Sequence, residues 1–208
     1  MIIHDIEQGT PEWHKLRAGL PTGSEFSRII TGTGKTSDSL PDYAFDLALE
    51  LFTGRPLDDA FSGNQHTKRG HNLEPAARAS YEFVYDCEIT QVGFVTDDAI
   101  TCGVSPDGFI GKDGLFEAKC LSDKEHIKLL MYHKKNGKAP AKYLPQCQGQ
   151  MHVCERDYCD LYFYHPEFRC LRIRQEPDKA LVQALKKQIL AVCAERNIIL
   201  NELRELAA

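Results

Sequence analysis

Apolar side chains recur at intervals of three and four residues in several stretches of the chain, which is the spacing of one buried helix face. A helix is also expected to begin at Thr22 or Ser24, after a loop that starts near residue 7. Gly54 is a typical residue to end the first long helix, and Pro75 fits the first turn of the second. The pattern predicts helices over residues 42–52, 73–84, 123–136, 142–155 and 177–205.

Between residues 89 and 120 the apolar positions occur in short runs that are separated by glycines. This pattern predicts three antiparallel strands, with a hairpin turn at residues 112–114 and a further strand at 160–165. Residues 31–41 and 57–66 are predicted loops. We therefore expect an α/β (α+β) fold, in which helices flank a small mixed central sheet. Because no linker-like or low-complexity stretch divides the 208 residues, one domain is expected over 1–208.

The composition changes this picture only slightly. The chain is 42% hydrophobic and 26% charged, within the usual range of a soluble globular protein. There is no apolar run long enough for a membrane span and no signal-peptide pattern, so a cytoplasmic protein is expected. Its net charge of −5 argues against a broadly basic nucleic-acid-binding surface. Eight cysteines without a CxxC pair predict reduced, mostly buried thiols, with a structural metal or iron–sulfur cluster as the alternative.

The candidate chemistry starts with two carboxylates on neighbouring predicted strands. Asp107 lies in the sequence SPDG, and Glu117 and Lys119 lie in EAK. Residues two apart on a strand point to the same face, so Glu117 and Lys119 are expected to project together, with Ala118 turned away. Two carboxylates on a rigid sheet edge suit Mg²⁺, and a nearby ammonium suits phosphate chemistry. An E-x-K sequence is common, however, and a solvated Glu117–Lys119 ion pair is the alternative.

Other candidate residues have equally plain structural explanations. Glu74 could serve as a further metal-site acid or could stabilise a helix start. Arg17 near the hydroxyl of Ser24 suits phosphate binding, whereas Trp13 could contact DNA or pack in the core. On the helix of YLPQCQGQM one glutamine is expected to face the sheet, and Gln148 is the candidate.

Taken in order, these segments resemble the YqaJ-like family of phage recombination nucleases, which includes the phage lambda exonuclease. The resemblance spans about residues 7 to 165. It rests on five phrases in sequence: QGTPEWHKLRAG, RGHNLEPAAR, SPDG, EAK and YLPQCQGQM.

The resemblance implies the restriction-endonuclease-like PD-(D/E)xK fold and a Mg²⁺-dependent exodeoxyribonuclease, for which Mn²⁺ could substitute. It implies 5′-to-3′ degradation of one strand of linear duplex DNA, which leaves a 3′ single strand for annealing. The implied metal ligands are Asp107, Glu117, the main-chain carbonyl of Ala118, and Glu74. Lys119 is then the catalytic lysine, and Gln148 is a helix residue beside the site.

The resemblance also implies that Arg17 and Ser24 bind the 5′-terminal phosphate and that Trp13 contacts the DNA end. It implies a homotrimeric ring around DNA, which would answer the objection from net charge. A single-strand annealing protein is the implied partner, in the cytoplasm of a bacterial host. Residues 57–68 depart from the family because they lack the apolar residues expected of a strand-separating wedge.

Three alternatives remain open from the sequence. An endonuclease on the same fold would cut closed circular DNA. A non-catalytic DNA-binding module of recombination would bind DNA and leave it intact. A cysteine-ligated redox or structural protein would contain zinc or show visible absorbance.

Overall fold

The structure is a computed structural model that describes residues 1–57 and 65–207. Its central sheet has the strand order β2-β5-β6-β7-β8. Only the β6–β7 pair is parallel, and the other neighbours are antiparallel. The strands are β2 (Ile89–Thr90), β5 (Gly108–Ile110), β6 (Gly114–Lys119), β7 (Tyr158–Phe163) and β8 (Leu171–Gln175).

A second, smaller sheet has the order β1-β3-β4 and is antiparallel throughout. Its strands are β1 (Ile2–His4), β3 (Phe94–Thr96) and β4 (Gly103–Val104). The region 89–120 therefore holds five strands of two sheets, and the prediction of three was wrong. Each of the missed strands is only two or three residues long, too short to show an alternating pattern.

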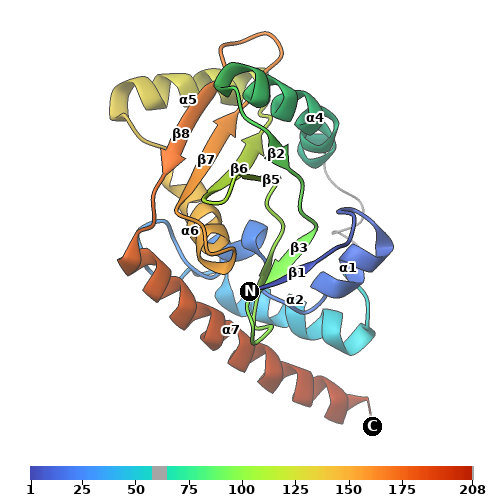
Figure 1. Cartoon of the computed structure of the whole chain (residues 1–208). Helices are drawn as coiled ribbons and strands as arrows, with labels where there is room; N and C mark the ends of the chain where they lie inside the picture. Colours follow the sequence, from blue (N-terminus) through green and yellow to red (C-terminus); the bar gives the residue numbers. More distant parts are fainter. Residues whose placement is uncertain (58–64, 208) are drawn as a thin grey trace.

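The helices lie around these sheets (Figure 1). In the view of Figure 1, α4 and α5 lie at one end of the central sheet, and α2 and α7 lie beyond its opposite end. The elements are α1 (Pro11–Arg17), η1 (Gly23–Arg28, a 3₁₀ helix), α2 (Leu40–Thr53), α4 (Gln65–Tyr85), α5 (Asp123–Asn136), η2 (Ala141–Tyr143), α6 (Leu144–Val153) and α7 (Lys179–Leu206). Within the described residues, no helix is long and apolar enough to cross a membrane.

Four of the predicted helices lie close to their predicted bounds, and the first of these ends at Gly54, which has φ of 67°. The helix of residues 73–84 is longer than predicted because α4 begins at Gln65. Pro75 therefore lies inside the helix, and its placement in the first turn was wrong. The segment that follows Thr22 is a 3₁₀ helix, and α1, which Thr10 caps, was not predicted.

The two faces of β6 pack against different layers. Phe116 joins a small core with Ala77 and Tyr81 of α4, whereas Leu115 joins the main core on the side of α6 and α7. This alternation is the ordinary period of a strand. It decides which side chains of Glu117–Lys119 share a face. Leu115 and Glu117 are two residues apart, so Glu117 faces α6.

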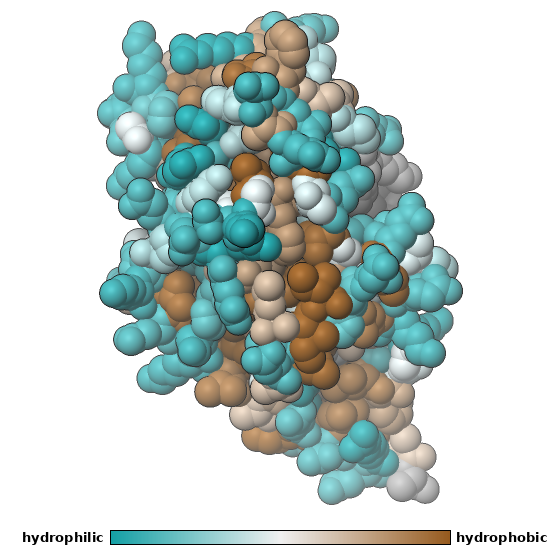
Figure 2. All heavy atoms as spheres, viewed as in Figure 1, coloured by the Kyte–Doolittle hydropathy of each residue, from teal (hydrophilic) through white to brown (hydrophobic). Residues whose placement is uncertain are grey.

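Hydrophilic side chains cover much of the face seen in Figure 2, and apolar ones gather toward its lower half, where α2 and α7 lie. All eight cysteines are free, four of them buried and four partly buried. The extent of a single domain over 1–208 stays a prediction.

Candidate active site

The carboxylates of Asp107 and Glu117 come from neighbouring segments of the sheet, as predicted: Glu117 lies in β6, and Asp107 directly precedes its partner strand β5. Asp107 Oδ2 accepts a hydrogen bond of 2.7 Å from the main-chain N–H of Ala118. That bond fixes Asp107 to the E-x-K segment, because the donor is the residue between Glu117 and Lys119.

Glu117 is almost fully buried, with 3% of its surface exposed. Its Oε1 accepts hydrogen bonds from Lys119 Nζ (2.7 Å) and Gln146 Nε2 (2.6 Å). Its Oε2 accepts one from Gln150 Nε2 (2.7 Å). A buried carboxylate with three donors is well compensated, so the structure holds Glu117 in one orientation.

Lys119 lies on the same face as Glu117, as the strand period predicts. Its Nζ also donates to Gln146 Oε1 at 3.0 Å. Burial by itself would lower the pKa of Lys119, but the charges of Glu117 and Asp107 outweigh it and raise that pKa. Lys119 is therefore a cation in the metal-free chain, which suits charge stabilisation and orientation better than proton abstraction.

The structure brings two glutamines to the site and places Gln148 elsewhere. Gln148 Nε2 donates to the main-chain carbonyl of Glu176, and its Oε1 accepts from the N–H of Asp178. Its amide therefore fixes the start of α7, and its predicted placement beside the metal site was wrong. Gln146 and Gln150, one helical turn apart, contact Glu117 instead.

Glu74 approaches from α4. Its Oε1 accepts a 2.9 Å hydrogen bond from Arg78, one turn later in the helix. Burial, together with the charges of Glu117 and Glu74, raises the pKa of Asp107 well above its usual value, although Lys119 and the Ala118 N–H act in the opposite direction. The three acids thus share one electrostatic site. Because Glu74 lies in the middle of α4, its position does not fit a helix-start residue.

The residues fit a hard divalent cation in their donor chemistry. Carboxylate oxygens are the ligands that Mg²⁺ prefers, and a bound cation would favour the ionised form of Asp107, whose pKa is raised by burial and by the neighbouring acids. The buried Oε1 of Gln150 also has no hydrogen-bond donor among the described residues. As they stand, no three His, Cys, Asp or Glu side chains within residues 1–57 and 65–207 form a ready ligand group. Metal binding therefore stays a proposal.

A second polar cluster surrounds the guanidinium of Arg17. Its Nη2 lies 3.3 Å from Thr22 Oγ1 and 3.5 Å from Ser24 Oγ, and Nη1 donates to Ser105 Oγ at 3.4 Å. Within the described part of the chain, no carboxylate lies at ion-pair distance from it. Burial lowers the pKa of Arg17 to about 10. A desolvated cation among hydroxyl groups is suited to an anion with several acceptor oxygens.

Trp13 forms one wall of this cluster. The guanidinium carbon of Arg17 lies 4.0 Å from the centre of the indole ring, and Trp13 Nε1 donates to Ser105 Oγ at 3.0 Å. Trp13 is only partly buried. Its indole therefore serves as a platform for Arg17, and a DNA contact by Trp13 stays a prediction.

Sequence reasoning missed three residues of the two clusters, Ser105, Gln146 and Gln150, and it named Thr22 as a helix start without assigning it to the site. Helix geometry pairs Gln146 with Gln150, because positions four apart share a face, but it does not say whether that face meets the sheet. Ser105 could have been suspected from its place two residues before Asp107. No local signal joins Ser105 to Arg17, which is 88 residues earlier in the chain.

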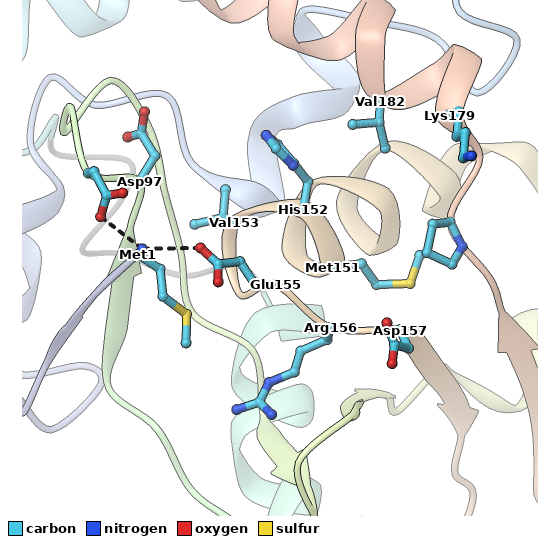
Figure 3. A pocket seen from close by; sticks show the side chains of 12 residues that line it. Met1, Asp97, Met151, His152, Val153, Glu155, Arg156, Asp157, Lys179 and Val182 are labelled. Carbon is cyan, nitrogen blue, oxygen red and sulfur yellow. Dashed lines mark hydrogen bonds and ion pairs between the residues drawn. The ribbon is translucent and has the colours of Figure 1, made fainter.

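The cavity drawn in Figure 3 lies apart from both clusters. It has a volume of about 550 Å³ and is bounded by the N-terminus, the end of α6 and the start of α7. The amino group of Met1 pairs there with Asp98 (2.8 Å) and Glu155 (3.3 Å). No residue of the carboxylate site or the Arg17 cluster lines it, so it takes no part in their chemistry.

Comparison with solved structures finds the same fold in exonucleases. The alkaline exonuclease of Laribacter hongkongensis superposes with a TM-score of 0.82 at 30% identity, over 95% of this chain and 98% of that one. The same enzyme in complex with dAMP gives equal values. A phage-related exonuclease of Haemophilus somnus 129PT, at 18% identity, shares the fold with a TM-score of 0.69, over 88% of this chain and 96% of that one. The PD-(D/E)xK fold is thereby confirmed.

Comparison with curated protein sequences gave no match. The model of the YqaJ-like viral recombinase domain matches residues 12–157, which is more than half of the chain and contains both clusters. This chain therefore belongs to the family of YqaJ-like viral recombinase domains.

Proposed function

We propose that this protein, an exonuclease by family and fold, is a Mg²⁺-dependent 5′-to-3′ exodeoxyribonuclease. It degrades one strand of linear double-stranded DNA to mononucleotides and leaves a 3′ single strand for recombination by strand annealing. The observation that carries the proposal is that one short segment, from Ser105 to Asp107, belongs to both clusters. Ser105 contacts Arg17, and Asp107 is bound to the segment of Glu117 and Lys119.

That connection suggests how a single nucleotide is measured. Ser105 contacts Arg17, and Asp107 belongs to the acidic site two residues later. Two residues of extended chain span at most about 7 Å, which is the scale of one nucleotide along a strand. A 5′-terminal phosphate held at Arg17 and Ser24 would bring the next phosphodiester toward Asp107 and Glu117. Release of a mononucleotide in each step follows from that spacing.

The residues of the acidic site have different proposed roles in catalysis. Asp107, Glu117, the Ala118 carbonyl and Glu74 would hold Mg²⁺, or Mn²⁺ as a substitute. When bound, the ion would supply Lewis-acid stabilisation of the phosphate and a more acidic water. The ammonium of Lys119 stabilises charge on the attacked phosphate. Gln146 bridges Lys119 and Glu117, which keeps the cation and the carboxylate in one arrangement.

The assembly is proposed from the family resemblance. A homotrimeric ring would enclose the duplex, so that DNA is held without a basic surface over the whole molecule. The single-strand annealing protein would take up the 3′ strand, in the cytoplasm of the bacterial host. The sequence predicts that residues 57–68 differ from the family, which places a strand-separating wedge there. Most of this segment, residues 58–64, lies outside the described residues.

The proposal is tested by digesting linear 5′-phosphorylated duplex beside covalently closed circular DNA, with Mg²⁺ or with EDTA. We expect Mg²⁺-dependent loss of the linear form alone, with mononucleotides released from the 5′ end. Cutting of the circle would favour an endonuclease of the same fold. Binding of DNA ends without any cutting would favour a recombination module that does not hydrolyse DNA.

Arg17→Gln is expected to remove most of the preference for phosphorylated ends. Hydrogen bonds to a charged group contribute about 1.5–3 kcal/mol, so the ratio of kcat/KM on 5′-phosphate and 5′-hydroxyl duplexes should fall by about tenfold to a hundredfold. The fold should tolerate the change, because burial disfavours this charge.

Arg28→Gln is the matched control. Arg28 lies in the nearby η1 and pairs with Asp46 at 2.7 Å, so it already has a carboxylate partner. Its replacement should leave the end preference unchanged. An equal loss of preference in both variants would contradict the assignment of Arg17.

A further inference from the structure

Gln150 has an unusual environment for a buried amide. Only 1% of its surface is exposed, and its Nε2 donates to Glu117 Oε2 at 2.7 Å. Its own Oε1 is buried without a hydrogen-bond donor among the described residues. Such an orphaned acceptor is uncommon in folded proteins and requires an explanation.

The two oxygens of Glu117 differ in what they can still accept. A carboxylate oxygen has about two acceptor sites. At Oε1 both are used, by Lys119 and Gln146. At Oε2 Gln150 is the one donor among the residues that the structure describes, so one acceptor site remains. Oε2 is therefore the oxygen of Glu117 that can serve a cation, and Gln150 sets its direction.

Gln150 also lies beneath the Arg17 cluster. A Cβ atom added to Gly23 would lie 3.0 Å from Val104 Cγ1 and 3.7 Å from Gln150 Cγ, so the backbone between Thr22 and Ser24 packs mainly on Val104 and has Gln150 beside it. The hydroxyls of Thr22 and Ser24 contact Arg17. Gln150 thus lies near the backbone of the proposed phosphate site while it contacts Glu117, and its burial restricts movement of its amide.

We propose that Gln150 is a positioning residue that aims Glu117 Oε2 at the catalytic cation. The inference rests on the proposed function, because it concerns the metal of that same site. In this proposal Gln150 acts through Glu117, to which its Nε2 donates. Groups that orient a metal ligand in this way typically alter metal affinity by about 10- to 100-fold.

The test replaces Gln150 by Met, which keeps the length of the side chain and removes both the donor to Glu117 and the unpaired Oε1. Mn²⁺ binding is measured by calorimetry on the DNA-free protein, and the Mg²⁺ half-saturation, kcat and KM are measured on linear duplex. Gln150→Met is expected to weaken Mn²⁺ binding by about 10- to 100-fold and to raise the Mg²⁺ half-saturation by a similar factor. The KM for DNA should stay unchanged, because the DNA contacts are intact.

Gln148→Met is the matched control, since Gln148 is an equally buried glutamine of α6 that binds the main chain before α7 instead of Glu117. It should lower the unfolding temperature and leave Mn²⁺ affinity unchanged. Gln150→Leu is a second variant in case the Met variant does not fold.

Weaker Mn²⁺ binding in the Gln150 variants alone supports the inference. The inference would be overturned if Mn²⁺ binding were unchanged in the Gln150 variants, or if Gln148→Met weakened Mn²⁺ binding equally. It would also be overturned if both Gln150 variants failed to fold. If the unaltered protein binds no Mn²⁺ and degrades no DNA, the proposed function itself fails, and this inference falls with it.

Discussion

Asp107→Asn is expected to lower kcat by about a thousandfold or more, because it removes a ligand that supports several kcal/mol of metal-assisted stabilisation. Mn²⁺ binding should fall with it. The fold should remain at least as stable at neutral pH. Burial and the neighbouring acids raise the pKa of Asp107, so its ionised form costs stability above its usual titration range, and a neutral amide avoids that cost. The Asn oxygen can still accept the Ala118 N–H.

These outcomes are measured by nucleotide release, calorimetry with Mn²⁺ and thermal unfolding. Asp97→Asn is the control, because Asp97 also accepts main-chain donors, from Thr101 and Cys102, but lies in the turn between β3 and β4. It should cost stability without loss of metal binding. Full nuclease activity in the Asp107 variant would show that Asp107 is not a metal ligand.

The position of Asp107 beside Glu117 could be predicted from the sequence. The spacing of Asp107 and Glu117 predicts two neighbouring strands, and the hairpin between β5 and β6 confirms that prediction. It succeeds because the turn is local: Ile110 pairs with Gly114, and Gly111 adopts φ of 55°. Local turn chemistry and strand alternation together fix which side chains of the E-x-K segment share a face.

The glutamines of α6 show where the sequence was insufficient. Three glutamines occur within five residues, at 146, 148 and 150, and only two of them can face the same neighbour. Helix geometry groups 146 with 150, but it does not say which side of the helix meets the sheet. That side is decided by the packing of Cys147 and Met151 in the core, which depends on distant strands.

The Arg17 cluster was predicted in part: the sequence paired Arg17 with Ser24, and the family resemblance added the 5′-terminal phosphate. Its hydroxyl groups come from Thr22, Ser24 and Ser105, and the last of these belongs to the loop between β4 and β5. The N–H of Gly103 donates to the carbonyl of Pro21, which brings β4 beside the start of η1. Such a contact between distant segments leaves no periodic pattern in the sequence, so the structure is needed to assemble the cluster.

Lys119→Met should separate catalysis from metal binding, in contrast to Asp107→Asn. Loss of the ammonium removes a preorganised positive charge, and losses of about 10²- to 10³-fold in kcat are typical for such groups. Glu117 Oε1 keeps its hydrogen bond from Gln146 at 2.6 Å, so its position should persist. With one positive charge fewer beside the acids, Mn²⁺ affinity should stay equal or increase.

Lys142→Met is the control and should change neither kcat nor Mn²⁺ affinity. Lys142 is an exposed lysine just before α6, and its Nζ lies 4.9 Å from the centre of the Tyr143 ring. If Lys119→Met lost Mn²⁺ binding together with kcat, the lysine would be needed to assemble the metal site, and its effect on catalysis would be indirect. If kcat were unchanged, the site would hydrolyse DNA without an ammonium. The predicted division, with kcat reduced and metal affinity retained, requires Lys119 to act on the phosphate, while Gln146 and Gln150 keep Glu117 in place for the cation.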